Sequence, residues 1–104
     1  MENRPEQESP VLIAQAGPLE GQRWDITKDL LIGRDADCDI IIATPDKQVS
    51  RRHASLILRD GEIMLQDLGS KNGTHLNSLR IDEAVKLEDG DTIQILSLIH
   101  ISEP

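Results

Sequence analysis

From residue 11 onward the apolar residues of this chain come in short runs, and turn-forming residues end each run. Runs such as VLIAQA, LLIG and CDIII are too short for helices, and no longer segment repeats its apolar residues at helical spacing. Short strands at such intervals are typical of sandwiches and barrels, and we count about ten to eleven of them. The sequence therefore predicts an all-β fold with little helix.

The clearest hairpin is the segment ASLILRDGEIMLQDL, which turns at Asp60 and Gly61. Both residue types tolerate the positive φ of a type I′ turn, and the flanking runs are rich in strand formers. Asn72-Gly73 marks a second tight turn, and the EDGD segment at 88–91 marks a third before an alternating strand. These turns support the strand-rich interpretation.

The length of 104 residues suits a single domain that can bury roughly two-thirds of its unfolded surface. We place this domain at residues 11–95. Residues 1–10 hold two prolines among Glu and Gln, which predicts a disordered lead or linker. Residues 96–104 are apolar but alternate poorly, and they resemble read-through of a sequencing adapter into an open reading frame. We therefore expect this tail not to be native sequence.

Charge and aromatic content narrow the classes of partner. Eleven Lys and Arg against 19 Asp and Glu give a net charge of −8, which argues against broad attraction to nucleic acid or anionic lipid. Trp24 is the only aromatic residue, so the stacking platforms that bind single-stranded nucleic acid are excluded. No apolar stretch has the length of a membrane span. We expect neither nucleic acid nor a membrane as a partner.

The cysteine content indicates a compartment. Cys38 is the only cysteine and cannot form an internal disulfide, and no secretory signal opens the chain. We therefore expect a cytoplasmic location, and we expect a monomer.

Three alternating carboxylates invite a calcium-loop interpretation. They are Asp35, Asp37 and Asp39 in the segment GRDADCDI. The EF-hand pattern needs Gly at its sixth position and Glu at its twelfth, where this chain has Ile40 and Asp46. We expect no metal and no cofactor, and we interpret the carboxylates as a solvated acidic turn.

Ser50 and His53 invite a hydrolase interpretation. The chain has no G-x-S-x-G nucleophile elbow here, and residues three apart on a strand point to opposite faces. We therefore do not expect an enzyme, and His53 is better explained as a structural residue.

The basic cluster QVSRRH stands out in an acidic chain. Lys47, Arg51 and Arg52 lie close together, whereas a nucleic-acid binder usually spreads its basic residues along a face. A compact cluster suits one phosphate group, on which an Arg fork, a hydroxyl and an amide can converge. The cluster therefore favours a small phosphate-binding site.

Four short motifs in a fixed order make a family resemblance specific. They are Gly33-Arg34, then Ser50-Arg51-x-His53, then Asn72-Gly73-Thr74, and then Asn77. Across residues 11–95 the chain resembles a forkhead-associated (FHA) domain. The resemblance implies an FHA-like β-sandwich whose loops at one end bind a phosphothreonine peptide.

The resemblance also implies roles for individual residues. The residues expected to bind the phosphate or the peptide are Arg34, Ser50, Arg51, Lys71 and Asn72. Those expected to form the scaffold of the binding loops are Gly33, His53, Gly73, Thr74 and Asn77. Lys71 stands where the family often has Ser or Thr, and here it could add a positive charge. Specificity is expected from the segments TPDKQ and NSLRIDEA, with Arg80 as a candidate contact.

Two main hypotheses of function remain open at this point. The first is a non-catalytic module that recognises phosphothreonine, made by a Ser/Thr kinase in a partner protein, for signalling assembly. The second is a β-sandwich that binds an unphosphorylated partner or self-associates. An enzyme or a nucleic-acid binder is a remote third, and activity dependent on Ser50 or salt-sensitive DNA binding would revive it.

Overall fold

The computed structural model describes residues 10–17, 19–42, 49–95 and 97–102. These residues form eleven strands, and none of them is helical. The strands are β1 (Val11–Ala16), β2 (Arg23–Asp25), β3 (Leu30–Gly33), β4 (Ile40–Ile41), β5 (Ala54–Arg59), β6 (Glu62–Asp67), β7 (His75–Leu76), β8 (Leu79–Arg80), β9 (Val85–Lys86), β10 (Thr92–Ile95) and β11 (Ser97–Ser102). The predicted all-β fold is confirmed.

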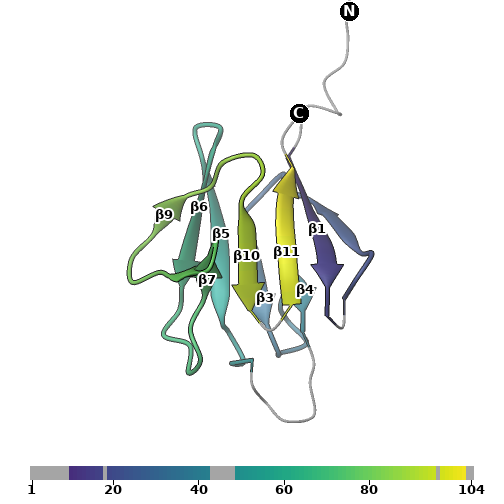
Figure 1. The fold of residues 1–104 in the computed structure, drawn as a ribbon, viewed down its shortest axis with the longest axis vertical. Helices are drawn as coiled ribbons and strands as arrows, with labels where there is room; N and C mark the ends of the chain where they lie inside the picture. The colour runs from purple at the N-terminus through teal and green to yellow at the C-terminus, as the bar shows by residue number, and fades with distance from the viewer. Residues whose placement is uncertain (1–9, 18, 43–48, 96, 103–104) are drawn as a thin grey trace, which may run out of the picture.

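The strands form two sheets that face each other (Figure 1). One sheet has the order β2-β1-β11-β10-β7-β8, and the other has the order β4-β3-β5-β6-β9. Neighbouring strands are antiparallel except for β3 and β4, which pair in parallel. This arrangement is a β-sandwich, in which each sheet buries one face against the other.

The hairpin of β5 and β6 turns where the sequence predicts it. Asp60 and Gly61 have φ values of 52° and 80°, as a type I′ turn requires, and Arg59 pairs with Glu62 across the turn. Alternate residues of both strands point to the core, as the buried pair Leu56 and Leu65 illustrates.

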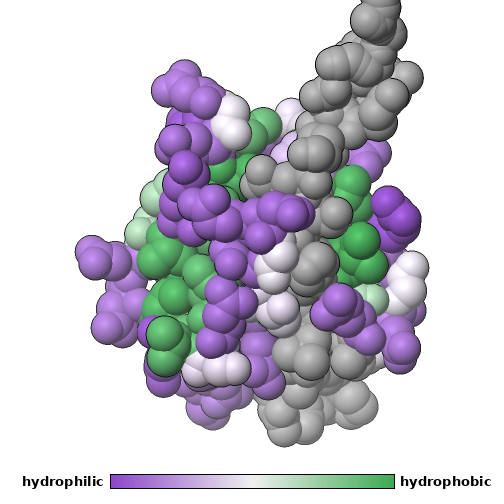
Figure 2. Space-filling view, turned by 45° about the horizontal axis from the view of Figure 1, so that its top comes forward, coloured by the Kyte–Doolittle hydropathy of each residue, from purple (hydrophilic) through white to green (hydrophobic). Residues whose placement is uncertain are grey.

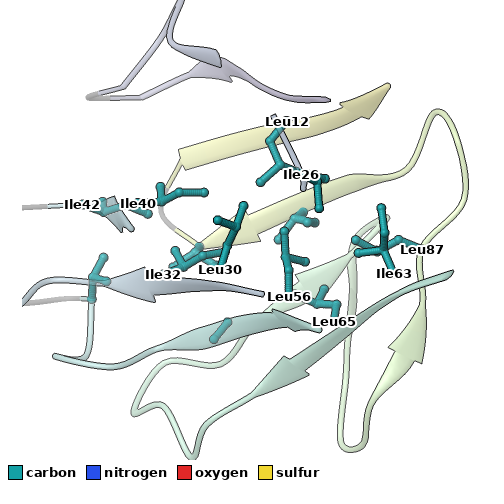
Figure 3. Packing of buried hydrophobic residues seen from close by; sticks show 14 residues of the cluster. Leu12, Ile26, Leu30, Ile32, Ile40, Ile42, Leu56, Ile63, Leu65 and Leu87 are labelled. Atoms are coloured by element: carbon teal, nitrogen blue, oxygen red, sulfur yellow. The ribbon is translucent and has the colours of Figure 1, made fainter. Parts of the chain in front are cut away.

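Aliphatic side chains fill the space between the sheets (Figure 3). The cluster of buried residues is Leu12, Ile26, Leu30, Ile32, Ile40, Ile42, Val49, Ala54, Leu56, Ile63, Leu65, Leu87, Ile93 and Ile95. Complete burial of one Leu or Ile side chain contributes about 1.5–3 kcal/mol, so this cluster is the main source of stability. Hydrophilic residues cover much of the described surface in Figure 2.

Strand pairing gathers three connections at one end of the sandwich. Ala54 at the start of β5 lies opposite Ile32 near the end of β3 and opposite Asp67 at the end of β6. The loop after β3, the segment before β5 and the loop after β6 therefore meet at the lower end in Figure 1. Loops supported in this way by a rigid sheet are common places for binding sites.

The two ends of the chain differ from the expected domain of residues 11–95. Residues 1–9 of the predicted lead lie outside the described residues, while the carbonyl of Pro10 accepts a hydrogen bond from Ile26 N at 2.9 Å. Ser97–Ser102 of the expected tail forms β11, which pairs with β1 on one side and β10 on the other. The sheet therefore continues past the predicted boundary at residue 95. No helix in the described part of the chain could cross a membrane.

Candidate phosphopeptide-binding site

Arg34 directly follows β3 and joins it to the segment before β5. Its backbone N–H donates to the carbonyls of Ser50 and Arg51, at 3.1 and 3.0 Å. Its side-chain Nε donates to the carbonyl of Val49 at 2.9 Å, and the residue is half-buried. Within the described residues no hydrogen bond or ion pair involves the two terminal nitrogens of its guanidinium.

Ser50 links this segment to the loop after β6. Its hydroxyl oxygen accepts a hydrogen bond from the backbone N–H of Lys71 at 3.0 Å. Because that bond uses a lone pair, the hydroxyl hydrogen can still be donated to a ligand oxygen. Arg34, Ser50 and Lys71, which lie far apart in the sequence, are thus brought together at one end of the sandwich.

His53 is buried, with an exposed fraction of 1%, and it joins the segment before β5 to the loop after β6. Its Nδ1 accepts a hydrogen bond from the backbone N–H of Ser50 at 3.1 Å, so this nitrogen carries no proton. Its Nε2 therefore carries the proton and donates it to the carbonyl of Gly73 at 2.8 Å. Both ring nitrogens are occupied by loop backbone, and the Ser50 hydroxyl is not bonded to the ring. This arrangement positions loops and does not activate a nucleophile.

Arg51 holds its neighbours by its backbone and exposes its side chain. The Arg51 carbonyl accepts hydrogen bonds from the backbone N–H groups of Arg34 and Asp35 and from the thiol of Cys38. Burial raises the pKa of that thiol, which keeps it neutral. Arg51 is exposed and directly follows Ser50 in the chain, so its side chain is accessible to an anionic ligand.

The backbone of Arg51 approaches Gly33 so closely that position 33 has no room for a side chain. A Cβ at Gly33 would collide with the carbonyl carbon and oxygen of Arg51 and would lie 3.0 Å from the Cys38 sulfur. The collision is with backbone that is itself held by hydrogen bonds, so it cannot be relieved by rotating a side chain.

Gly33→Ala is expected to destabilise the fold by about 2–4 kcal/mol, because the added methyl group must displace the Arg51 backbone. Urea unfolding measures the loss. Gly21→Ala is the matched control, since Gly21 has a φ of 92° but no atom within 4 Å of its built Cβ. The control should cost only about 1 kcal/mol from backbone strain. Equal losses in the two variants would contradict the collision.

The carboxylate of Asp67, at the end of β6, organises the loop at 68–74. Its Oδ2 accepts hydrogen bonds from the backbone N–H groups of Gly69 and Ser70, both at 3.0 Å. Its Oδ1 accepts hydrogen bonds from the hydroxyls of Ser70 and Thr74, the latter at 2.7 Å. Sequence reasoning misses Asp67, although an Asp with Gly and Ser two and three residues later is a signal for a side-chain-capped turn.

The same hydrogen bonds set the pKa of Asp67. Partial burial acts to raise the pKa of this carboxyl, but the hydrogen bonds from Ser70, Thr74 and Gly69 outweigh burial and hold the pKa below its usual range. A depressed folded pKa means that the stabilisation is present above the unfolded pKa of about 3.9 and is lost as the pH falls through the folded pKa.

Asp67→Asn is therefore expected to lower the melting temperature by an amount that depends on pH. The difference from the wild type should be constant from neutral pH to about pH 5 and should shrink below about pH 4. Circular dichroism melts across this range measure it, with Asp60→Asn in the exposed hairpin turn as the control. A difference that persists at low pH would show that the carboxylate charge is not what stabilises the loop.

The turn that carries Lys71 and Asn72 is closed by Gly73. Gly73 has a φ of 87°, and its N–H donates to the Ser70 hydroxyl at 2.9 Å. Lys71 and Asn72 are exposed on this turn, while Thr74 is fully buried beneath it. The turn thus brings the backbone of Lys71 to the Ser50 hydroxyl and carries exposed Lys71 and Asn72.

Asn77 lies elsewhere. It has a φ of 51° in the turn between β7 and β8, and its side chain donates to Asp91 Oδ1 and accepts from Thr92 N, both at 2.9 Å. Asn77 therefore fastens that turn to the start of β10, and among the described residues its side-chain hydrogen bonds go to Asp91 and Thr92 rather than to the loops that hold Arg34 and Ser50.

Two segments, NSLRIDEA and TPDKQ, are expected to set the peptide specificity, and the structure describes only the first of them. Within the segment NSLRIDEA, Arg80 lies over Gly73, because a Cβ built on Gly73 would be 2.7 Å from Arg80 Nε. The segment TPDKQ at 44–48, with Lys47, lies outside the described residues.

Two of the three acidic residues after β3 have structural partners. Asp37 forms an ion pair with Arg52 at 2.7 Å, and Asp39 accepts a hydrogen bond from Leu31 N at 2.8 Å. Among the described residues no group of three or more His, Cys, Asp and Glu side chains is placed to hold a metal ion.

Comparison with known proteins identifies the family. The protein-family model named FHA domain matches residues 30–96 of this chain. The glycogen accumulation regulator GarA of Mycolicibacterium smegmatis is 41% identical over 88 residues, which cover 84% of this chain and 54% of that protein. The chain belongs to the FHA domain family. This FHA domain spans about half the length of the curated relatives it matches.

Solved structures agree with this membership. One, from a structural and functional analysis of phosphothreonine-dependent FHA domain interactions, has a TM-score of 0.80 and 31% identity, with 92% of this chain and 97% of that chain covered. Another is Mycobacterium tuberculosis EmbR in complex with a low-affinity phosphopeptide, with a TM-score of 0.78, 31% identity, and 92% and 25% of the two chains covered. The expected FHA-like β-sandwich is confirmed.

Proposed function

We propose that this FHA domain is a non-catalytic module that binds phosphothreonine in a partner protein, with Arg34, Ser50 and Lys71 holding the phosphate. The observation that carries the proposal is the convergence of these residues. The Arg34 N–H bonds the Ser50 carbonyl, and the Ser50 hydroxyl bonds the Lys71 N–H, so the three side chains start from adjoining backbone.

The chemistry of the three groups suits a phosphate monoester. Such a phosphate carries a charge of about −1.5 to −2 near neutral pH and has three acceptor oxygens. The terminal nitrogens of Arg34 supply a charged fork, Ser50 supplies a hydroxyl, and Lys71 supplies a second cation. Hydrogen bonds to charged groups contribute about 1.5–3 kcal/mol each, so three of them supply much of the roughly 8 kcal/mol of a micromolar complex.

Asn72 and Arg51 complete the proposed site. Both are exposed on the segments that hold the phosphate ligands. Asn72, with an amide that can donate and accept, is assigned to the peptide backbone beside the phosphothreonine, and Arg51 is assigned to the phosphate or the backbone. His53, Gly33, Gly73 and Thr74 act as the scaffold beneath them.

The similar structures support phosphothreonine as the ligand class. One of them comes from work on phosphothreonine-dependent FHA interactions, and EmbR is bound to a phosphopeptide. A Ser/Thr kinase would produce the ligand, and the domain would serve signalling assembly as a monomer. We also propose a cytoplasmic location, for which the free, buried thiol of Cys38 is suited.

Fluorescence polarisation with matched peptides tests this function. Peptide libraries with a central phosphothreonine, phosphoserine or unmodified threonine are titrated with the domain. Binding to phosphothreonine in the micromolar range is expected, with unmodified threonine at least about a hundredfold weaker because the charge-assisted hydrogen bonds are lost. Equal affinity for the phosphorylated and unmodified peptides would favour the alternative, a phosphate-independent or self-associating β-sandwich.

A further inference from the structure

Four of the nine cations in the described part of the chain have an acidic partner, and the other five are unevenly placed. Lys28, Arg52, Arg59 and Lys86 each lie within 4 Å of a carboxylate. Within the ranges that the structure describes, the cations without such a partner are Arg23, Arg34, Arg51, Lys71 and Arg80. All of these except Arg23, which is on β2, lie on the binding loops or next to them.

Arg80 is placed beside the phosphate site by its strand. It lies on β8 and pairs with His75 of β7, directly after the loop at 68–74. A Cβ built on Gly73 would be 2.7 Å from Arg80 Nε and 2.9 Å from its Cζ, so the guanidinium lies over Gly73. Gly73 is buried and Arg80 is exposed. Arg80 therefore covers the turn next to Asn72 and faces solvent.

The phosphate of the ligand does not require all four of the unpaired cations at the binding loops. Arg34, Arg51 and Lys71 already exceed the charge of about −2 on one phosphate monoester. Unpaired like charges repel one another, and a chain with 19 Asp and Glu could pair Arg80 as it pairs Arg52. An unpaired Arg80 beside the site is therefore suited to an anion that the ligand brings.

We propose that Arg80 forms a second anion-binding subsite, which reads an acidic side chain of the peptide close to the phosphothreonine. The inference rests on the proposed function and names its ligand class more narrowly, as phosphothreonine peptides with a neighbouring anion. The guanidinium fork can hold a carboxylate or a second phosphate, and both present paired oxygens to it.

A peptide array tests the subsite. Asp, Ala, Lys or phosphoserine is placed singly at each position around a fixed phosphothreonine, and affinities are measured by fluorescence polarisation. At one position Asp is expected to bind about fivefold tighter than Ala, and the preference should shrink at high salt. The phosphoserine arm shows whether carboxylate or phosphate is the better occupant of the same subsite.

Substitutions at Arg80 separate this subsite from the phosphate site. Arg80→Met keeps an unbranched stem over Gly73 and should abolish the preference for Asp while retaining the affinity for the Ala peptide. Arg80→Glu should reverse the preference toward Lys at that position. Arg23→Met, which removes the unpaired cation on β2, is the matched control and should change neither affinity.

Each other outcome is decisive. A preference for Asp that survives in Arg80→Met overturns the subsite, and so does a wild-type domain that binds phosphothreonine peptides without any acidic preference. Both leave the proposed function intact. If the domain binds the phosphothreonine peptides of the array no more tightly than matching peptides with unmodified threonine, the proposed function is overturned, and the subsite with it.

Discussion

Arg34→Ala is expected to weaken binding to a phosphothreonine peptide by about a hundredfold or more, because a charged fork is worth about 3 kcal/mol in such a site. The Arg34 backbone N–H still donates to the Ser50 and Arg51 carbonyls in the variant. Among the described residues, the one Arg34 side-chain hydrogen bond that the variant loses is that from Nε to the Val49 carbonyl. Fluorescence polarisation measures the affinity, and a thermal melt shows whether the fold persists.

Two further variants make the Arg34 experiment specific. Arg34→Lys keeps the charge but has no fork and no Nε to bond Val49, so it should recover only part of the affinity. Arg52→Ala removes a cation from the same cluster, but its guanidinium already pairs with Asp37 at 2.7 Å. Arg52→Ala should therefore change affinity little. If it matched Arg34→Ala, a diffuse positive field and not a fixed phosphate contact would explain the binding.

Local sequence patterns are sufficient to predict the all-β fold class and the hairpin of β5 and β6. Alternation of buried residues and the turn pair Asp60-Gly61 depend on neighbours in the chain, and the register of β5 and β6 follows from them. The order of the motifs, through the family resemblance, then predicts that Arg34, Ser50 and Lys71 lie on neighbouring loops. The pairing of β3, β5 and β6 places these loops at one end of the sandwich.

Long-range geometry accounts for what the sequence does not predict. The nearby Gly69 and Ser70 signal only the turn at Asp67, whereas its bond to the Thr74 hydroxyl, seven positions away, has no sequence signal. Asn77 is close in sequence to the binding turn, yet β7 carries the chain away from it to the start of β10. Arg80 returns to the turn only because β8 pairs back along β7.

Removal of residues 96–104 is expected to abolish cooperative unfolding, although the sequence marks them as a doubtful tail. β11 is the strand between β1 and β10, so the truncated sheet would be split into β2-β1 and β10-β7-β8. Each hydrogen bond contributes about 1 kcal/mol of net stability. Loss of the backbone hydrogen bonds on both sides of β11 is therefore comparable to the free energy of unfolding of a whole domain, roughly 5–15 kcal/mol. The core residues Leu12 and Ile93 would also lose their neighbouring strand.

The truncation tests whether the sheet needs a strand at the position of β11. It does not test whether residues 96–104 are native sequence. Backbone pairing accepts any residues that can be extended, so a tail that is not native could still supply β11. Replacing 97–102 with alternating Val and Thr should therefore preserve the cooperative thermal transition, whereas truncation after Ile95 should remove it. Deletion of residues 1–9 is the control, and it should leave the transition unchanged. A truncated chain that melts like the full one would mean that β1 and β10 do not depend on β11, and the domain would then end at residue 95.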